Sequence, residues 1–397
     1  MYANISTSSQ SLDFIKKNFA NYYETVNLIL PDRFGKREFA FVLFGGKGML
    51  RHISFGRKQE IEKFLAERVP THVYYSTAFY QKPDAPSMKE KLWMGAELIF
   101  DLDSDHLPNA EKVSYQNQLL MVKKEFLKLV NDFLLNDFGF EEENIELYFS
   151  GGRGYHCHVK DSTIFHLDSN ERREIVDYIT GRDLRESILF REHVTSTITI
   201  RGRQVPNLKT LKMPKPIEPG WRGRISRGII ELVDEIKSSN DPLKKLQEYG
   251  VKSKDAEKLL SDFSDERIDR IREGNLDQSK TIRKFFLNSA LRKTAVSMGA
   301  GETDEPVTCD VKRLIRLPSS LHGKTGFKVT KIKLDELDEF DPLRDAVVFS
   351  DNPVKIQLIN SINIRMMDEE FNLKNEIEEV PLYLAIFLIG RKMAKLL

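Results

Sequence analysis

The uneven distribution of β-forming and charged residues along the chain constrains its fold more than any single motif does. Residues 1–170 contain short runs of β-formers separated by turns and helical segments. Residues 171–297 are charged, mostly of helical spacing and poor in β-formers, with a proline-, glycine- and arginine-rich stretch at 201–228 that we interpret as a loop. β-like character returns over 307–333. We therefore predict an α+β (mixed α/β) fold with one core, residues 1–170 and 298–397, interrupted by a mostly helical insert, residues 171–297.

The composition allows a packed core but excludes a protein whose net charge alone attracts nucleic acid. The 397 residues are 40% hydrophobic, which suffices for one large domain with an insertion or for two domains. The 61 Lys and Arg against 60 Asp and Glu give a formal charge of +1. Any attraction for a polyanion must therefore come from local patches.

No segment predicts export or membrane insertion. Met1 to Phe19 lacks the basic start, apolar run and cleavage site of a signal peptide. The most apolar stretch, Pro381 to Gly390, is about half as long as a membrane helix, so we expect a core helix there. The two cysteines, Cys157 and Cys309, form no CxxC pair, and sparse cysteine is typical of a reducing compartment. We expect a cytoplasmic protein without a membrane partner.

The acidic end of one expected strand, Ala96 to Asp103, is the sharpest local signal. Residues two apart on a strand face the same side, so Asp101 and Asp103 project together. Adjacent carboxylates repel each other unless a cation lies between them, and such oxygen ligands suit Mg²⁺ or Mn²⁺. Two ions of this kind assist phosphoryl transfer. A solvated strand end is the alternative, and we assign Asp105 to the following loop.

A glycine-rich turn, Ser150 to Gly154, follows a second expected strand at Ile145 to Phe149. Such a turn lets backbone N–H groups approach an anion closely, and Arg153 adds a planar fork suited to phosphate oxygens. His156 and His158 share one face of the next strand, where one of them can donate to a phosphate or a sugar hydroxyl. A tight hairpin turn with a structural arginine explains the same pattern equally well.

The same two histidines offer an alternative zinc site, because both point the same way. Asp161 is the one additional ligand nearby, and it lies just beyond the strand. We therefore assign the metal to the acidic strand and expect no zinc.

A basic segment, Val311 to Lys333, contains seven Lys or Arg and no acidic residue. Such a cluster attracts a triphosphate or a template backbone, although a solvated basic hairpin is a common alternative. Gly323 to Thr325 looks like the end of a phosphate loop, but Pro318 stands where that pattern requires a glycine. Asp310, just before the cluster, is a candidate third metal-binding carboxylate.

Together these three constellations are the parts of a nucleotidyltransferase, and the sequence resembles the small subunits of archaeo-eukaryotic primases, in particular the archaeal branch. The similar segments are short but occur in family order over nearly the whole chain: Leu30–Phe41, Glu97–Asp103, Ser150–His158, Arg313–Gly326 and Pro381–Ile389. The resemblance implies the primase catalytic fold with a helical subdomain attached. It also implies a DNA primase that synthesises primers de novo on single-stranded DNA for replication.

The resemblance implies residue roles where the motifs match. Asp101, Asp103 and Asp310 resemble the three catalytic aspartates, which bind two Mg²⁺ or Mn²⁺ ions. The residues that resemble the family's nucleotide-binding set are Ser150, Arg153, His156, Arg316, His322, Lys324 and, in a matching Arg-Glu-Phe motif, Arg37. In the implied reaction, a 3′-hydroxyl attacks the α-phosphate of a nucleoside triphosphate and pyrophosphate leaves.

Family members usually work with a large subunit that carries an iron–sulfur cluster, so the resemblance implies that partner. Many members also have a cysteine-rich zinc knuckle after the acidic pair; residues 106–120 contain no cysteine, and we expect the knuckle to be missing or metal-free. Two alternatives remain: a primase-polymerase that extends primers in repair or end joining, and a non-catalytic binder of nucleotides or nucleic acid. The basic stretch 201–228 is either a track for single-stranded DNA with Trp221 stacking on a base, or a loop anchored by a buried tryptophan.

Overall fold

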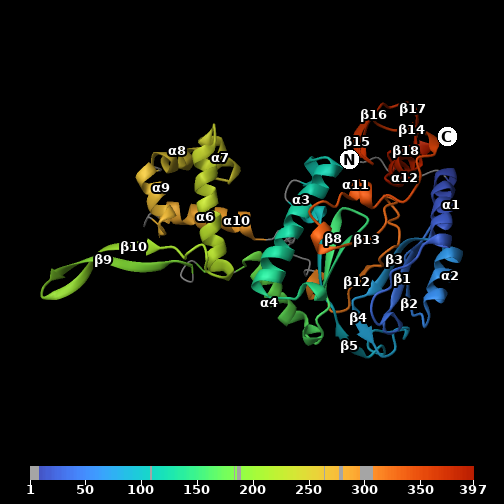
Figure 1. The fold of residues 1–397 in the computed structure, drawn as a ribbon, viewed down its shortest axis with the longest axis horizontal. Coiled ribbons are helices and arrows are strands. Elements are labelled where there is room, and N and C mark those ends of the chain that lie inside the picture. The colour runs from blue at the N-terminus through green and yellow to red at the C-terminus, as the bar shows by residue number, and fades with distance from the viewer. Residues whose placement is uncertain are drawn as a thin grey trace. The chain divides into compact units, whose positions relative to one another are not determined.

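The computed structural model describes residues 9–107, 110–182, 184–185, 189–262, 264–276, 280–295 and 307–397. The chain divides into two compact units: Met1–Val176 with Ser297–Leu397 (unit 1), and Asp177–Val296 (unit 2). Helix α4 (Ser169–Thr180) runs across the boundary between them. Helices and sheets occur in both units, which confirms the mixed α+β class (Figure 1).

Two four-stranded antiparallel sheets of unit 1 carry the sequence motifs. Their strand orders are β12-β3-β1-β2 and β13-β7-β8-β6. The strands are β1 (Phe39–Leu43), β2 (Met49–Ile53), β3 (Pro70–Ser76), β6 (Leu98–Asp103), β7 (Ile145–Phe149), β8 (Gly154–Val159), β12 (Leu314–Arg316) and β13 (Thr330–Ile332). The strands expected at Ala96–Asp103 and Ile145–Phe149 are thereby confirmed.

Smaller ladders and several helices complete unit 1. The smaller ladders pair β4 (Ala78–Tyr80) with β5 (Trp93–Ala96), β14 (Pro353–Leu358) with β17 (Ile377–Pro381) and β18 (Ala394–Leu396), and β15 (Ile362–Met366) with β16 (Glu369–Leu373). The helices are α1 (Ser9–Thr25), α2 (Lys58–Arg68), α3 (Tyr115–Lys128) with its π-helical continuation Leu129–Asp137, α11 (Pro342–Asp345) and α12 (Leu382–Gly390).

Helix α12 confirms the core helix expected in the most apolar stretch of the sequence. Residues Tyr383 to Ile389 are all buried. Within the described ranges, no helix combines the length and the apolar character needed to cross a membrane.

Alternation along β6 and β8 separates an apolar face from a polar one. On one face, Leu102 pairs with Tyr155, whose ring stacks on Phe126 of α3 with 5.2 Å between ring centroids. On the other face, Asp101 pairs with His156. That polar face is turned toward the first sheet, because the hydroxyl of Tyr75 on β3 lies 3.3 Å from Nδ1 of His158. The candidate catalytic side chains therefore lie where the two sheets meet.

Unit 2 is mostly helical but also contains a long antiparallel hairpin. Its strands are β9 (Arg191–Ile200), β10 (Arg203–Lys212) and β11 (Asn275–Leu276), in the order β11-β10-β9. Its helices are α6 (Gly220–Ser238), α7 (Pro242–Glu248), α8 (Ser253–Asp262), α9 (Asp265–Arg272) and α10 (Lys280–Thr294).

The loop expected at residues 201–228 is wrong. Most of its first half is strand β10, because β9 carries a run of β-branched residues with which β10 pairs. Its last residues already belong to α6, which begins after Pro219. Trp221 is 6% exposed and its Nε1 donates to the Tyr178 carbonyl oxygen at 2.7 Å. A base-stacking role for Trp221 is therefore wrong, and the alternative of a buried anchor holds.

Candidate active site

The acidic end of β6 lies opposite the histidine strand β8. Asp101 pairs in register with His156 and Asp103 with Gly154. Nε2 of His156 is 3.5 Å from Oδ1 of Asp101. Both aspartates are partly open, with 23% of the Asp101 side chain and 32% of the Asp103 side chain exposed. They line one cavity of about 220 Å³ together with Tyr74, Ser150, Gly152, His156, Arg313, Leu314, Ile315, Arg316 and His322.

Electrostatics at this end of β6 favour the arrival of a cation. Burial is the largest cause that raises the pKa of Asp103, and the charges of Asp105 and Asp101 raise it further. Arg153 opposes this shift from 3.9 Å, but it is also ion-paired with Asp105. Two carboxylates on one strand face, open to a cavity, are the oxygen donors that a divalent metal ion requires.

The third aspartate lies in an adjoining cavity. Asp310 follows the short 3₁₀ helix Val307–Cys309, which packs beside β6. It lines a cavity of about 400 Å³ with Arg51 and Lys312, and Tyr74, Arg313 and Leu314 line this cavity as well as the first one. Over the described ranges, no three His, Cys, Asp or Glu side chains are gathered into a ready-made metal cluster. The three aspartates thus face two neighbouring hollows.

The glycine turn is closely packed against the basic segment. Ser150 Oγ accepts hydrogen bonds from the backbone N–H groups of Gly152 and Gly154, each at 3.2 Å. A residue with a side chain does not fit in place of Gly154, since its Cβ would lie 2.3 Å from the Leu102 carbonyl oxygen. At Gly151, φ is +77° and a Cβ would lie 2.9 Å from Cβ of His322. Glycine at these positions lets the turn approach His322 and β6 at the same time.

Arg316 and His322 of the basic segment face the acidic strand end across the first cavity. Arg316 lies on β12, its Nη1 is 2.6 Å from Nδ1 of His72, and its guanidinium carbon is 4.9 Å from the Tyr74 ring centroid. The His72 and His322 rings are 4.9 Å apart. Lys324 is exposed and is not among the residues that line either cavity.

His72 on β3, His322 of the basic segment and His156 on β8 are neutral near pH 7. Burial lowers the pKa of His156 to about 4 even though Asp101 opposes the shift. Burial, followed by the charges of Arg316 and Lys324, lowers the pKa of His72 to about 3. Burial is again the largest cause at His322, whose pKa lies well below its usual value. Permanent positive charge in the cavity therefore comes from arginine.

Two polar atoms of the cavity residues have no internal partner. Among the described residues, neither Nδ1 of His156 nor Nε of Arg313 finds a hydrogen-bond partner, although both atoms are buried. Buried polar atoms are normally hydrogen-bonded, so these two are available to a bound group. The Nε–H of Arg313 is a donor for an anionic ligand, beside carboxylates for a cation.

The structure places Arg37 away from both cavities. Its side chain is fully buried and donates to the carbonyl oxygens of Asp32, Ser76 and Thr77. It also forms an ion pair with Glu97, which is 2% exposed. Arg37 therefore joins the strands at the start of β6 and does not meet the other candidate nucleotide-binding residues.

Tyr74 and Arg313 line the cavities and His72 lies against Arg316, but the sequence patterns singled out none of these three residues. His72 and Tyr74 stand two apart on β3, and the pairing of β3 with β12 brings them to Arg316. His72 and Tyr74, two polar residues at alternate positions of one strand, were the sequence signal that could have indicated a shared polar face. Arg313 belongs to the basic segment, but its position at both cavities depends on the fold.

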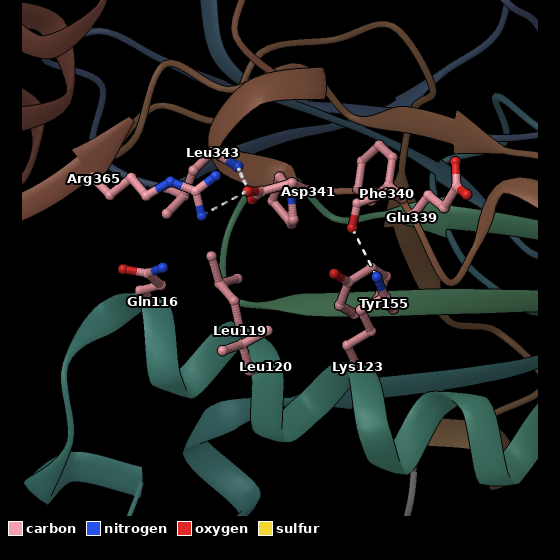
Figure 2. A pocket seen from close by; sticks show the side chains of 11 residues that line it. Gln116, Leu119, Leu120, Lys123, Tyr155, Glu339, Phe340, Asp341, Leu343 and Arg365 are labelled. Carbon is pink, nitrogen blue, oxygen red and sulfur yellow. Dashed lines mark hydrogen bonds and ion pairs between the residues drawn. The ribbon is translucent and has the colours of Figure 1, made fainter. Parts of the chain in front are cut away.

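A third hollow of unit 1 lies on the opposite face of β8. It has a volume of about 200 Å³ and is bounded by α3 and by the segment leading into α11 (Figure 2). Lys123 of α3 donates to the carbonyl oxygens of Asp338 and Phe340, which closes one side. None of the candidate catalytic residues lines this hollow.

Comparison with known proteins places the whole chain in one family. A family model described as DNA primase small subunit matches residues 100–333. A DNA primase small subunit of Methanothrix thermoacetophila is 42% identical over 98% of this chain and 99% of its own length. Those of Methanococcoides burtonii and Picrophilus torridus are 40% and 42% identical, over 96% and 94% of this chain and 97% and 95% of their own lengths.

Proposed function

This chain belongs to the DNA primase small-subunit family, a family of primer-synthesising enzymes, and we propose on that premise that it is a template-directed nucleotidyltransferase that starts primers de novo by two-metal catalysis. The observation that supports this most is the cavity in which Asp101 and Asp103 face Arg313, Arg316 and His322. Carboxylates on one side and cationic donors on the other suit a reaction whose substrates and leaving group are phosphates.

Asp101, Asp103 and Asp310 are the residues that would hold divalent cations, Mg²⁺ or Mn²⁺. Carboxylate oxygens are the donors these ions prefer, and the raised pKa of Asp103 fits a site that lacks its counter-charge. Bound cations supply charge neutralisation at the attacking hydroxyl and at the leaving pyrophosphate. Asp310 lines the adjoining cavity, and Tyr74, Arg313 and Leu314 line both cavities. In this proposal Asp310 therefore holds a cation from the far side of these three residues.

The other cavity residues bind and orient the nucleoside triphosphate. Arg316 and Arg313 supply guanidinium groups for phosphate oxygens, and the unpartnered Nε of Arg313 gives one donor that no internal group uses. Neutral His156 and His322 act as hydrogen-bond donors or acceptors and add no charge. Ser150 and Arg153 shape the turn, and Lys324, whose backbone N–H lies 3.4 Å from Nδ1 of His322, adds a positive charge near that histidine. The packing of Arg37 gives it a structural role in this proposal.

The partners follow from the proposed reaction. Single-stranded DNA is the template, nucleoside triphosphates are the substrates, and a primase large subunit is the companion that the family implies. No zinc is included, and the cytoplasmic location expected from the sequence stays a prediction.

Primer synthesis on unprimed circular single-stranded DNA tests the proposal. The protein, with and without a large subunit, is incubated with labelled nucleotides and Mg²⁺ or Mn²⁺, and products are resolved by length. Metal-dependent products without any added primer support the proposal. Products that appear only with a primer support a repair-type primase-polymerase instead, and no incorporation under either condition supports a non-catalytic binder.

A further inference from the structure

Positive charge in unit 2 is concentrated on the β9–β10 hairpin and the segment that follows it. Residues 191–215 contain six Lys or Arg and a single acidic residue, Glu192. In the rest of the chain the acidic residues outnumber Lys and Arg by 59 to 55. The near-zero net charge of the protein therefore conceals a strongly basic segment in unit 2, in addition to the basic segment Val311 to Lys333 of unit 1.

Several cations of the unit 2 helices are ion-paired, whereas the two arginines at the tip of the hairpin are not paired with any described acidic residue. Lys237 pairs with Asp265 at 2.9 Å, and Lys293 pairs with Glu231 at 3.2 Å. By contrast, Arg201 and Arg203 are exposed, and no acidic side chain in the described part of the chain lies within ion-pair distance of them. Unpaired cations at the surface retain their full attraction for an anionic ligand.

The hairpin presents these cations in a fixed arrangement. Arg201 and Gly202 form the two-residue connection, with φ of 50° and 76°, between Ile200 and its register partner Arg203. Positive φ at both residues is the turn geometry that matches the twist of a two-stranded ribbon. The hairpin extends away from the helices of its own unit (Figure 1). Both arginines are therefore held at the tip, accessible from either face.

Exposed apolar side chains lie next to the arginines. Ile198 pairs in register with Val205, two positions from the Ile200–Arg203 pair, so these side chains share one face of the ribbon. Ile198, Ile200 and Val205 are 43%, 50% and 38% exposed. Exposed apolar clusters edged by charge are typical of binding surfaces.

We propose that this hairpin is a binding site for single-stranded nucleic acid, separate from the nucleotide cavity. A single strand offers phosphates for Arg201 and Arg203 and unstacked base faces for the apolar side chains, whereas a duplex hides its base faces. A second copy of the chain is a poor occupant, because two hairpins in contact would bring like charges together. The strand is the template of the proposed primase, so the identity of the ligand rests on the proposed function.

Direct binding measurements test the site without any catalysis. A fluorescent oligodeoxythymidylate of about 16 nucleotides is titrated with the full-length protein, without nucleotides or divalent metal, and anisotropy gives the affinity. Arg201→Glu with Arg203→Glu should weaken binding by at least about tenfold. Arg201→Gln with Arg203→Gln should flatten the dependence of log affinity on log salt by about 1.4, because each phosphate contact on a single strand contributes about 0.7.

A matched control separates the hairpin from general charge. Lys252→Glu with Lys254→Glu makes the same charge change at two exposed positions of unit 2, one just before α8 and one within it, and should leave the affinity within about twofold of wild type. Ile198→Ser should weaken binding of the single strand and leave that of a duplex of equal length unchanged. Circular dichroism checks that each variant is folded.

The outcomes distinguish this site from the proposed function. If the Arg201 and Arg203 variants bind the oligonucleotide as tightly as the Lys252 and Lys254 control, the hairpin is not the site. If wild type binds the duplex as tightly as the single strand, the assignment to single strands is wrong. If the hairpin variants bind the oligonucleotide with wild-type affinity but no longer bind a purified large subunit, the surface is a protein interface and the proposal is overturned. Loss of primer synthesis in Asp101→Ala supports the proposed function. Unchanged oligonucleotide affinity in the same variant supports a strand-binding site that is separate from the catalytic cavity.

Discussion

The two ends of strand β6 use acidic residues in opposite ways. Glu97, just before the strand, is buried and ion-paired with buried Arg37, and its second oxygen lies 3.6 Å from Nδ1 of His158. Burial raises its pKa, but Arg37 and His158 outweigh burial and leave it below the usual value. At the other end, burial and neighbouring carboxylates raise the pKa of Asp103, and Asp101 opens to a cavity.

This difference separates structural charge from functional charge on one strand face. The buried Arg37–Glu97 ion pair, whose guanidinium also donates to three carbonyl oxygens, holds strands together. Carboxylates side by side on one strand face, whose burial and repulsion Arg153 offsets only in part, cost stability, and such clusters are typical of catalytic sites. The comparison therefore predicts that substitutions at the two ends of β6 have opposite consequences for folding and for activity.

The largest expected effect is on catalysis at the open end. Asp101→Ala should lower primer synthesis by about a thousandfold or more, because it removes a proposed cation ligand and charge stabilisation of this kind is worth several kcal/mol. Its free energy of unfolding should stay within about 0.5 kcal/mol of wild type or rise, because like-charge repulsion is relieved. Primer assays and urea unfolding measure both. Substantial synthesis by this variant would refute the assignment of Asp101.

The next effect is on stability at the paired end. Arg37→Ala should lower the free energy of unfolding by about 3–5 kcal/mol, because Glu97 is left buried without its partner. Arg37→Met combined with Glu97→Leu should recover much of that loss, since no uncompensated charge then remains. Chemical unfolding with activity per folded molecule separates the roles. A stable Arg37→Ala protein with impaired nucleotide affinity would return Arg37 to the nucleotide site.

A smaller effect is expected at the basic segment facing the open end. His322→Ala should raise the KM for nucleotides by about tenfold, the loss of roughly one hydrogen bond to a charged group, and should change kcat less. His166→Ala, at an exposed histidine distant in sequence, is the matched control. Equal KM values for His322→Ala and wild type would remove His322 from the proposed nucleotide site.

The smallest effect is a pH dependence of stability from His72. The native pKa of about 3 lies below the usual 6.5, so the unfolded chain binds a proton that the native state does not bind. The free energy of unfolding should therefore fall as pH decreases from about 6.5 toward 3, by only roughly a few tenths of a kcal/mol per pH unit, because solvent screens this partly exposed ring. His72→Gln should show a shallower decline in thermal unfolding across that range. Identical slopes in the two proteins would contradict the expectation.

The sequence predicted what depends on short-range pattern. Alternation placed Asp101 and Asp103 on one strand face, and the apolar run from Pro381 predicted the core helix α12. Both signals need only a few neighbouring residues, and the resemblance to primases, which the comparisons confirm, joined motifs spread over the chain.

Features that depend on distant pairing were not predictable in the same way. Tyr74 reaches the cavity and His72 reaches Arg316 because β3 pairs with β12, some 240 positions later. Arg37 matches a family motif, but a motif does not reveal that its side chain is buried against Glu97. The β9–β10 hairpin was missed because Arg, Pro and Gly interrupt its β-forming residues, and pairing in register overrides that local composition.

Binding of Mn²⁺ in the presence of a nucleoside triphosphate, followed by electron paramagnetic resonance, tests most directly whether the carboxylates of the two adjoining cavities act as one site. The account predicts that Asp101→Asn, Asp103→Asn and Asp310→Asn each weaken Mn²⁺ binding, while Glu97→Gln leaves the folded fraction with wild-type affinity. Unchanged Mn²⁺ affinity in both Asp101→Asn and Asp310→Asn would contradict it.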